Sequence, residues 1–168
     1  MSWHHKLKGK MVVLLAKAMP SVYNRFTLKL TENKEDKVAA SLDKPLSEAR
    51  VTLITSAGVH LKKDEPFDAL SDGDYSYRVI PADTEVEELE VTHIYYDTKQ
   101  AKVDKTIVFP LPQLRDLAAQ GKIGSVSNVN IGLNGGTLKP ERHEKETAPL
   151  VVDLLKDDQV NIALLVPG

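Results

Sequence analysis

Cysteine is absent from the sequence: none of the 168 residues is a cysteine. Its absence excludes disulfide bonds, thiolate metal sites and a cysteine nucleophile within this sequence. A strong excess of charge of either sign is also absent, since the formal net charge is −2. Because there is no basic excess to neutralise phosphates, we do not expect nucleic acid as a partner.

A long apolar run is missing as well, and no stretch approaches the roughly 18 residues that a membrane-spanning helix requires. Near the N-terminus, three lysines precede the apolar run 11–15, and a small-x-small pattern follows at 16–18. This order resembles a signal peptide, but the apolar run is too short and Lys17 interrupts the cleavage pattern. We therefore expect a cytoplasmic protein that begins with a short amphipathic helix.

The residues that are present are typical of a soluble globular protein of one ordinary domain, with 42% apolar and 27% charged residues. Residues 31–50 are mostly polar, which indicates a connector. The sequence therefore predicts an N-terminal helical arm with its connector over residues 1–44, followed by an α/β domain over residues 45–168.

Short β-branched stretches alternate with stretches whose apolar residues have helical spacing. The predicted strands are 51–55, 75–80, 90–96, 129–133 and 160–166. The predicted helices are 111–118, which ends at Gly121 or Gly124, and 147–155, with Thr147 as its N-cap. Residues 56–60 are predicted as a loop. This alternation favours an α/β fold with a mainly parallel sheet and flanking helices.

The last predicted strand is followed by Pro167 and Gly168 alone. A parallel strand is normally followed by a loop and a helix that covers it. One interpretation is a sheet that ends on this strand, and the other is a domain that is incomplete at its C-terminus. In the second case Ile162, Leu164 and Val166 would form an uncovered edge, which predicts a homo-oligomer that buries it.

Five segments, in their order along the chain, resemble the B-type subunits of the glycine, sarcosine, betaine and D-proline reductases. They are LITSAGVHL (53–61) with Pro66-Phe67, GDYSYRVIP (73–81), THIYYDT (92–98) with Asp104, VFPLPQLRDL (108–117) with Gly121 and 123–124, and VNIALLVP (160–167). The ordered set covers most of residues 45–168, whereas residues 1–44 contribute little to the resemblance.

In the family that these segments resemble, the last strand leads into a redox motif of selenocysteine or cysteine, two residues, and cysteine. The resemblance implies that the redox residue lies beyond Gly168 and that this chain holds no redox cofactor of its own. Because selenocysteine is encoded by a stop codon read in a special context, an in-frame UGA is expected after Gly168. The chain alone is then expected to be inactive.

The resemblance further implies reductive cleavage of a carbon–nitrogen bond in glycine, sarcosine, betaine or D-proline. A selenolate or thiolate would attack the carbon that bears the nitrogen, and a thiol-based donor would supply the electrons. Other reductase subunits are implied as partners, and one of them can carry a pyruvoyl group.

Polar residues lie at or just beyond the ends of the predicted strands, where open α/β sheets bind their ligands. The candidate catalytic residues are His60, His93 and Asp97, and the candidate substrate-binding residues are Ser56, Tyr96 and Asn134. An imidazole could protonate the leaving amine or pair with the selenolate, while Asp97 orients it and Tyr96 binds a carboxylate. The structural alternative is that His93 is hydrogen-bonded inside the sheet and that Asp97 caps a turn.

Other functions remain open from the residues alone. His60, His93 and Asp97 could form a zinc site, but no HxH or HExxH spacing supports one, so no metal is expected. A non-catalytic binding or assembly domain is one rival function. A racemase-like enzyme or a metal-assisted hydrolase is the other.

Overall fold

The computed structural model describes residues 40–71, 73–137 and 139–168, together with residues 7, 11, 14, 15 and 18–22. Most of the predicted arm and connector therefore lies outside the described residues, and the division after residue 44 stays a prediction. Within the described part, no helix is long and apolar enough to cross a membrane.

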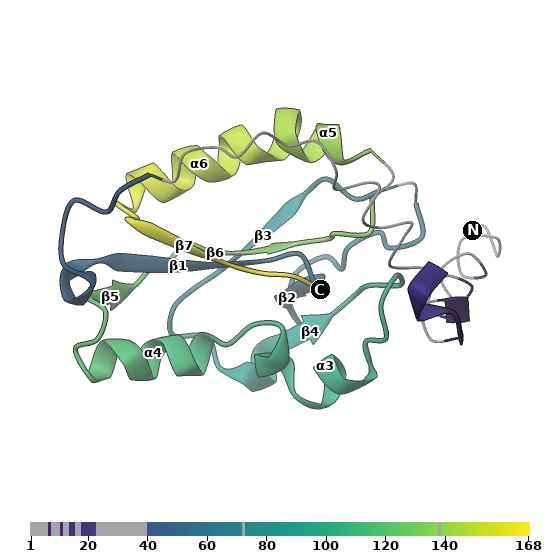
Figure 1. Ribbon diagram of the computed structural model, residues 1–168, viewed down its shortest axis with the longest axis horizontal. Helices are drawn as coiled ribbons and strands as arrows, with labels where there is room; N and C mark the ends of the chain where they lie inside the picture. Colours follow the sequence, from purple (N-terminus) through teal and green to yellow (C-terminus); the bar gives the residue numbers. More distant parts are fainter. Residues whose placement is uncertain are drawn as a thin grey trace.

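A five-stranded sheet forms the centre of the molecule (Figure 1). Its central strand β1 (Arg50–Thr55) pairs in parallel with β7 (Ile162–Val166) along one edge. Along its other edge β1 pairs in parallel with β5 (Ser125–Val126) and then with β6 (Asn130–Leu133). β3 (Tyr77–Ile80) joins β6 in the antiparallel sense. The predicted α/β fold with a mainly parallel sheet is confirmed.

Helices cover the two faces of this sheet (Figure 1). One face carries α5 (Pro140–Arg142) and α6 (Ala148–Asp157), which a π-helical turn, His143–Thr147, joins. The other face carries α3 (Lys99–Val103), α4 (Leu111–Ala119) and a separate two-stranded antiparallel sheet of β2 (Val59–Leu61) and β4 (Leu89–Val91). Short 3-10 turns complete the chain at Leu46–Glu48, Val86–Glu88 and Lys105–Ile107.

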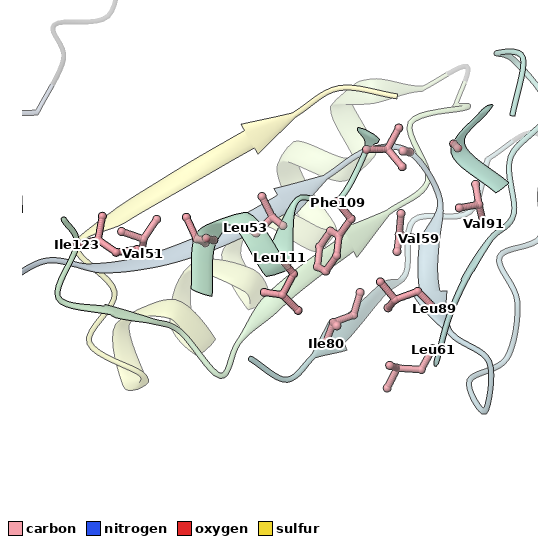
Figure 2. Close-up of a cluster of buried hydrophobic side chains, with 14 residues drawn as sticks. Val51, Leu53, Val59, Leu61, Ile80, Leu89, Val91, Phe109, Leu111 and Ile123 are labelled. Carbon is pink, nitrogen blue, oxygen red and sulfur yellow. The ribbon is translucent and has the colours of Figure 1, made fainter. Parts of the chain in front are cut away.

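The main hydrophobic core lies between the sheet and the α4 face (Figure 2). Leu53 from β1 and Ile80 from β3 are fully buried there, and Phe109 and Leu111 lie at the start of α4. The apolar spacing of α4 directs Leu111 and Leu114 into this core. The helix ends as predicted at Gly121, whose φ of 66° is one that glycine adopts without strain.

Three local predictions were wrong. The strand predicted over 90–96 ends at Val91, because its partner β2 is only three residues long and offers no further pairing. His60, expected in a loop, lies within β2, because it pairs with Glu90 of β4. Thr147 does not cap a helix, because the π-helical turn continues directly into α6 and leaves no free helix start at this residue. Its hydroxyl donates to the carbonyl oxygen of Tyr75 instead.

Candidate functional site at the carboxyl ends of the strands

The chain segments that leave β1, β6 and β7 meet at Ser56. The Ser56 N–H donates to the Val166 carbonyl oxygen at the end of β7 (3.2 Å), and the Gly135 N–H donates to the Ser56 carbonyl oxygen (2.8 Å). The Gly168 N–H donates to Ser56 Oγ at 3.2 Å. Three parallel strands thus deliver their following residues to one place, which is where open α/β sheets hold their ligands.

Asn134 follows β6 directly and carries a buried hydrogen-bond donor without a partner in the described part of the chain. Its side chain is 1% exposed, and its Oδ1 accepts the Gly136 N–H at 3.1 Å. Flipping the amide would set Nδ2 against that N–H, so the hydrogen bond fixes Oδ1 as acceptor and Nδ2 as the unpaired donor. A buried unpaired donor costs about 1–3 kcal/mol and is unusual, which marks this amide for an acceptor from outside.

The loop after β4 packs aromatic rings against this place. The Tyr96 hydroxyl donates to the Ala57 carbonyl oxygen at 3.1 Å, and burial raises the pKa of Tyr96 to about 12, so the phenol stays protonated. The Tyr95 ring lies against Gly136, where a Cβ atom would stand only 2.5 Å from the ring. A glycine is therefore required at this contact.

His93 belongs to the same loop. Its ring centroid lies 4.7 Å from that of Tyr96, and its Nδ1 accepts the Tyr95 N–H at 3.1 Å. Burial lowers the pKa of His93 to about 4, so the ring is neutral at physiological pH. With Nδ1 as acceptor, the proton of the neutral ring is on Nε2.

The other two candidate catalytic residues have different surroundings. Both ring nitrogens of the buried His60 are engaged, Nδ1 with the Leu61 carbonyl oxygen (2.8 Å) and Nε2 with Thr92 Oγ1 (2.9 Å). These contacts stabilise the two-stranded β2–β4 sheet and leave no nitrogen for a substrate. The exposed Asp97 accepts the Lys99 N–H at 3.4 Å at the start of α3. Whether it also orients His93, as predicted, stays a prediction.

Sequence reasoning missed His143. Its Nε2 lies 3.2 Å from the Asn134 carbonyl oxygen and its Nδ1 lies 3.3 Å from Thr147 Oγ1. The ring therefore ties the π-helical turn to the residue with the unpaired amide. The spacing of four residues between His143 and Thr147 was the available signal, because residues four apart face each other on a helix. Within the described residues, no group of three or more His, Asp or Glu side chains could hold a metal ion.

The fold and this converging edge define an α/β domain with a candidate ligand site at the carboxyl ends of its parallel strands. The family model described as glycine/sarcosine/betaine reductase selenoprotein B matches residues 8–167, and the chain belongs to this family. The chain is also 38% identical over 125 residues to the D-proline reductase subunit gamma of Acetoanaerobium sticklandii. The match covers 74% of this chain and 51% of that protein, so the chain spans about half the length of this relative. No solved structure matches the chain.

Proposed function

We propose that this chain is part of the substrate-reducing subunit of an amino-acid reductase, with its ligand site around Ser56 and Asn134. The proposed reaction is reductive cleavage of the carbon–nitrogen bond of glycine, sarcosine, betaine or D-proline. The observation that carries the proposal is the convergence of β1, β6 and β7 on Ser56 in a chain of this reductase family.

The redox residue of the proposed subunit is the selenocysteine or cysteine expected beyond Gly168. It would supply the nucleophile for the carbon that bears the nitrogen. The end of β7 is well placed to bring it to the site, because the Gly168 N–H donates to Ser56 Oγ and a Cβ atom added at Gly168 would meet Ala57.

The residues of this chain would bind and orient the substrate. All four proposed substrates carry a carboxylate next to the carbon–nitrogen bond, and a carboxylate oxygen is the acceptor that Asn134 Nδ2 lacks. The Ser56 hydroxyl offers a second donor beside it, since its oxygen accepts from Gly168 and its own proton is free to be donated. We assign Tyr96 to positioning rather than to carboxylate binding, because its proton is held by the Ala57 carbonyl oxygen.

His93 would act as a neutral group. With a pKa of about 4 the ring is neutral at neutral pH, so it cannot act as a general acid toward a leaving amine. Its available contribution is a hydrogen bond donated by the Nε2–H group. An anionic selenolate nearby would favour the charged ring and raise this pKa. Asp97 remains the proposed partner of His93. We assign His60 a structural role in the two-stranded β2–β4 sheet.

The proposed partners follow from the family. The relative from A. sticklandii is named as a subunit, and we propose that this chain likewise works with other reductase subunits and a thiol-based electron donor.

Substrate binding tests the role of Asn134. In a reductase complex produced from the natural DNA, including the sequence downstream of Gly168, Asn134→Leu should raise the Kd for D-proline by about tenfold, the effect of about 1.4 kcal/mol. The affinity for pyrrolidine, which lacks the carboxylate, should not change. Asn128→Leu is the matched control, because Asn128 is exposed and precedes β6 at the opposite end of the strand.

The same preparation tests the whole proposal. The complex should turn over at least one of the four amino acids with a dithiol as reductant, and the 168-residue chain alone should not. The DNA should read UGA directly after the Gly168 codon and encode cysteine three residues later. Another stop codon, or no coding frame beyond it, would contradict the proposed redox residue and favour the assembly-domain alternative.

A further inference from the structure

The strand β7 presents large apolar side chains to solvent. Leu164 is 41% exposed and Leu165 is 70% exposed, whereas Ile162 and Val166 pack against the main core. Of the three residues predicted to be uncovered, Leu164 is exposed, whereas Ile162 and Val166 are partly buried; Leu165 is exposed on the opposite face of the strand, because side chains alternate along it. Two large apolar side chains exposed on the two faces of one edge strand indicate that another element covers both faces of this strand.

A groove of about 710 Å³ lies on the α6 face of the sheet, which is the face to which Leu165 points. Its walls are mainly apolar: α6 provides Val151, Val152 and Leu155, and the sheet provides Ile54, Leu133 and Ala163. Polar residues of α5 and the π-helical turn complete the lining, namely Glu141, His143, Glu144 and Thr147. Of the residues in α6, only Val151 is fully buried, so the helix covers the sheet incompletely. The groove lies along β7, because Ala163 is on the same face of that strand as the exposed Leu165.

The outer edge of β7 has none of the features that protect a solvent-exposed edge. All five residues pair with β1 in regular register, and no described strand pairs with the other edge. The sequence Ile-Ala-Leu-Leu-Val contains no charge and no proline, and no bulge interrupts its pairing. Edges that remain in water are normally blunted by such devices. This edge has the character of an internal strand.

The length of the relative from A. sticklandii indicates what covers this surface. The match with this chain leaves about half of that protein unaccounted for. We infer that a strand from this unmatched portion pairs with the free edge of β7 and that a helix from it fills the groove beside α6. This inference rests on family membership and on the shape of the surface, and not on the proposed chemistry.

A second copy of the chain fits the surface less well. Antiparallel pairing of β7 with β7 of a second copy would satisfy both backbones. It would also place the two β7 strands side by side with no helix over them on the α6 face, and neighbouring strands lie about 4.8 Å apart. The result is an open channel about 10 Å wide between the two copies of α6, which is the spacing that one further helix occupies. A strand and a helix from one partner fill both gaps.

The test uses this chain co-expressed with the unmatched portion of the A. sticklandii protein, made as a separate polypeptide. We expect the two to co-purify in a 1:1 ratio by native mass spectrometry. Amide hydrogen exchange over residues 162–166 should slow at least tenfold relative to the chain alone. Leu165→Arg should abolish both effects. Val103→Arg, at a residue that is 84% exposed on the short helix α3, is the matched control and should change neither.

A single-chain fusion of the two parts keeps the test decisive if the separate portion does not fold, because the same protection of residues 162–166 is then read within one molecule. Absence of protection in the fusion would overturn the inference. Protection of β7 in a homodimer of this chain, with no change on adding the partner portion, would overturn it in favour of a second copy. Substrate turnover is not measured, so loss of the proposed activity would leave this result unaffected.

Discussion

The two faces of the central sheet differ in how completely they are covered. On the α4 face, Phe109, Leu53 and Ile80 are fully buried in one continuous core. On the α6 face, a single helix leaves a groove of about 710 Å³ and an exposed Leu165. The same strands supply both faces, so the difference arises from what packs on them. The α4 face is covered over most of its area and leaves Leu164 of β7 exposed, whereas the α6 face has the features of an interface.

The candidate site lies at the end of the α4 face, the closed face of the sheet; the α6 face is the open face. Tyr96 packs against the main core while its hydroxyl supports Ala57, and His93 packs on Tyr96. Ligand sites need groups that are held rigidly, and the closed face provides that rigidity. The open face meets the same site through His143, which joins the π-helical turn to Asn134. A partner bound in the groove would therefore contact an element that reaches the site.

The largest expected effect tests the difference between the faces directly. Phe109→Ala should lower the free energy of unfolding by about 3–5 kcal/mol, because it empties a fully buried position. Val152→Ala in the groove should lower it by less than about 1 kcal/mol, since this residue is 43% exposed. Urea unfolding followed by circular dichroism measures both. Similar losses at the two positions would show that the faces are equally packed.

The next effect concerns His93 and acid stability. Its pKa is about 4 in the folded chain, below its ordinary value of 6.5, so the unfolded chain binds more protons between these values. The stabilisation is complete above pH 6.5 and declines as the pH falls toward 4, by at most about 3 kcal/mol. His93→Gln should flatten this part of the stability profile. Tyr96→Phe is the control, because the pKa of Tyr96 lies far above this range.

A smaller effect is expected at Tyr96 near neutral pH. Tyr96→Phe removes the hydrogen bond to the Ala57 carbonyl oxygen and should cost about 1 kcal/mol. The thermal unfolding midpoint measures this loss, and hydrogen exchange at residues 56–58 should rise with it. A change in stability without faster exchange at this turn would contradict the positioning role.

The smallest effect on stability is expected at the open face. Leu165→Ser should change the free energy of unfolding by no more than about 0.5 kcal/mol, because the side chain is mostly in water already. It should nevertheless reduce self-association of the chain, measured by light scattering as a function of concentration. A loss above 2 kcal/mol would show that Leu165 is buried within the chain in solution.

Much of the fold was predictable because its signals are local. The β-branched run of β1 and the leucine spacing of α4 each indicate one structure, and both elements formed within two residues of the predicted bounds. The length of β4 was not predictable, because it depends on a partner strand that is distant in sequence. Thr147 was misread for a similar reason, since whether a helix starts there depends on what precedes it in space.

The candidate site shows the same division. The residue types near the strand ends and the resemblance to the reductase family could be identified from the sequence, and the family match confirms the resemblance. Which of these residues contact one another could not be identified from the sequence. The contacts depend on hydrogen bonds between residues that are far apart in the chain, such as Ser56 and Gly168, which are 112 residues apart. Sequence patterns record periodicity and composition within a segment. The occupied nitrogens of His60, the unpaired amide of Asn134 and the open face beside β7 are set by long-range packing, which only the tertiary structure decides.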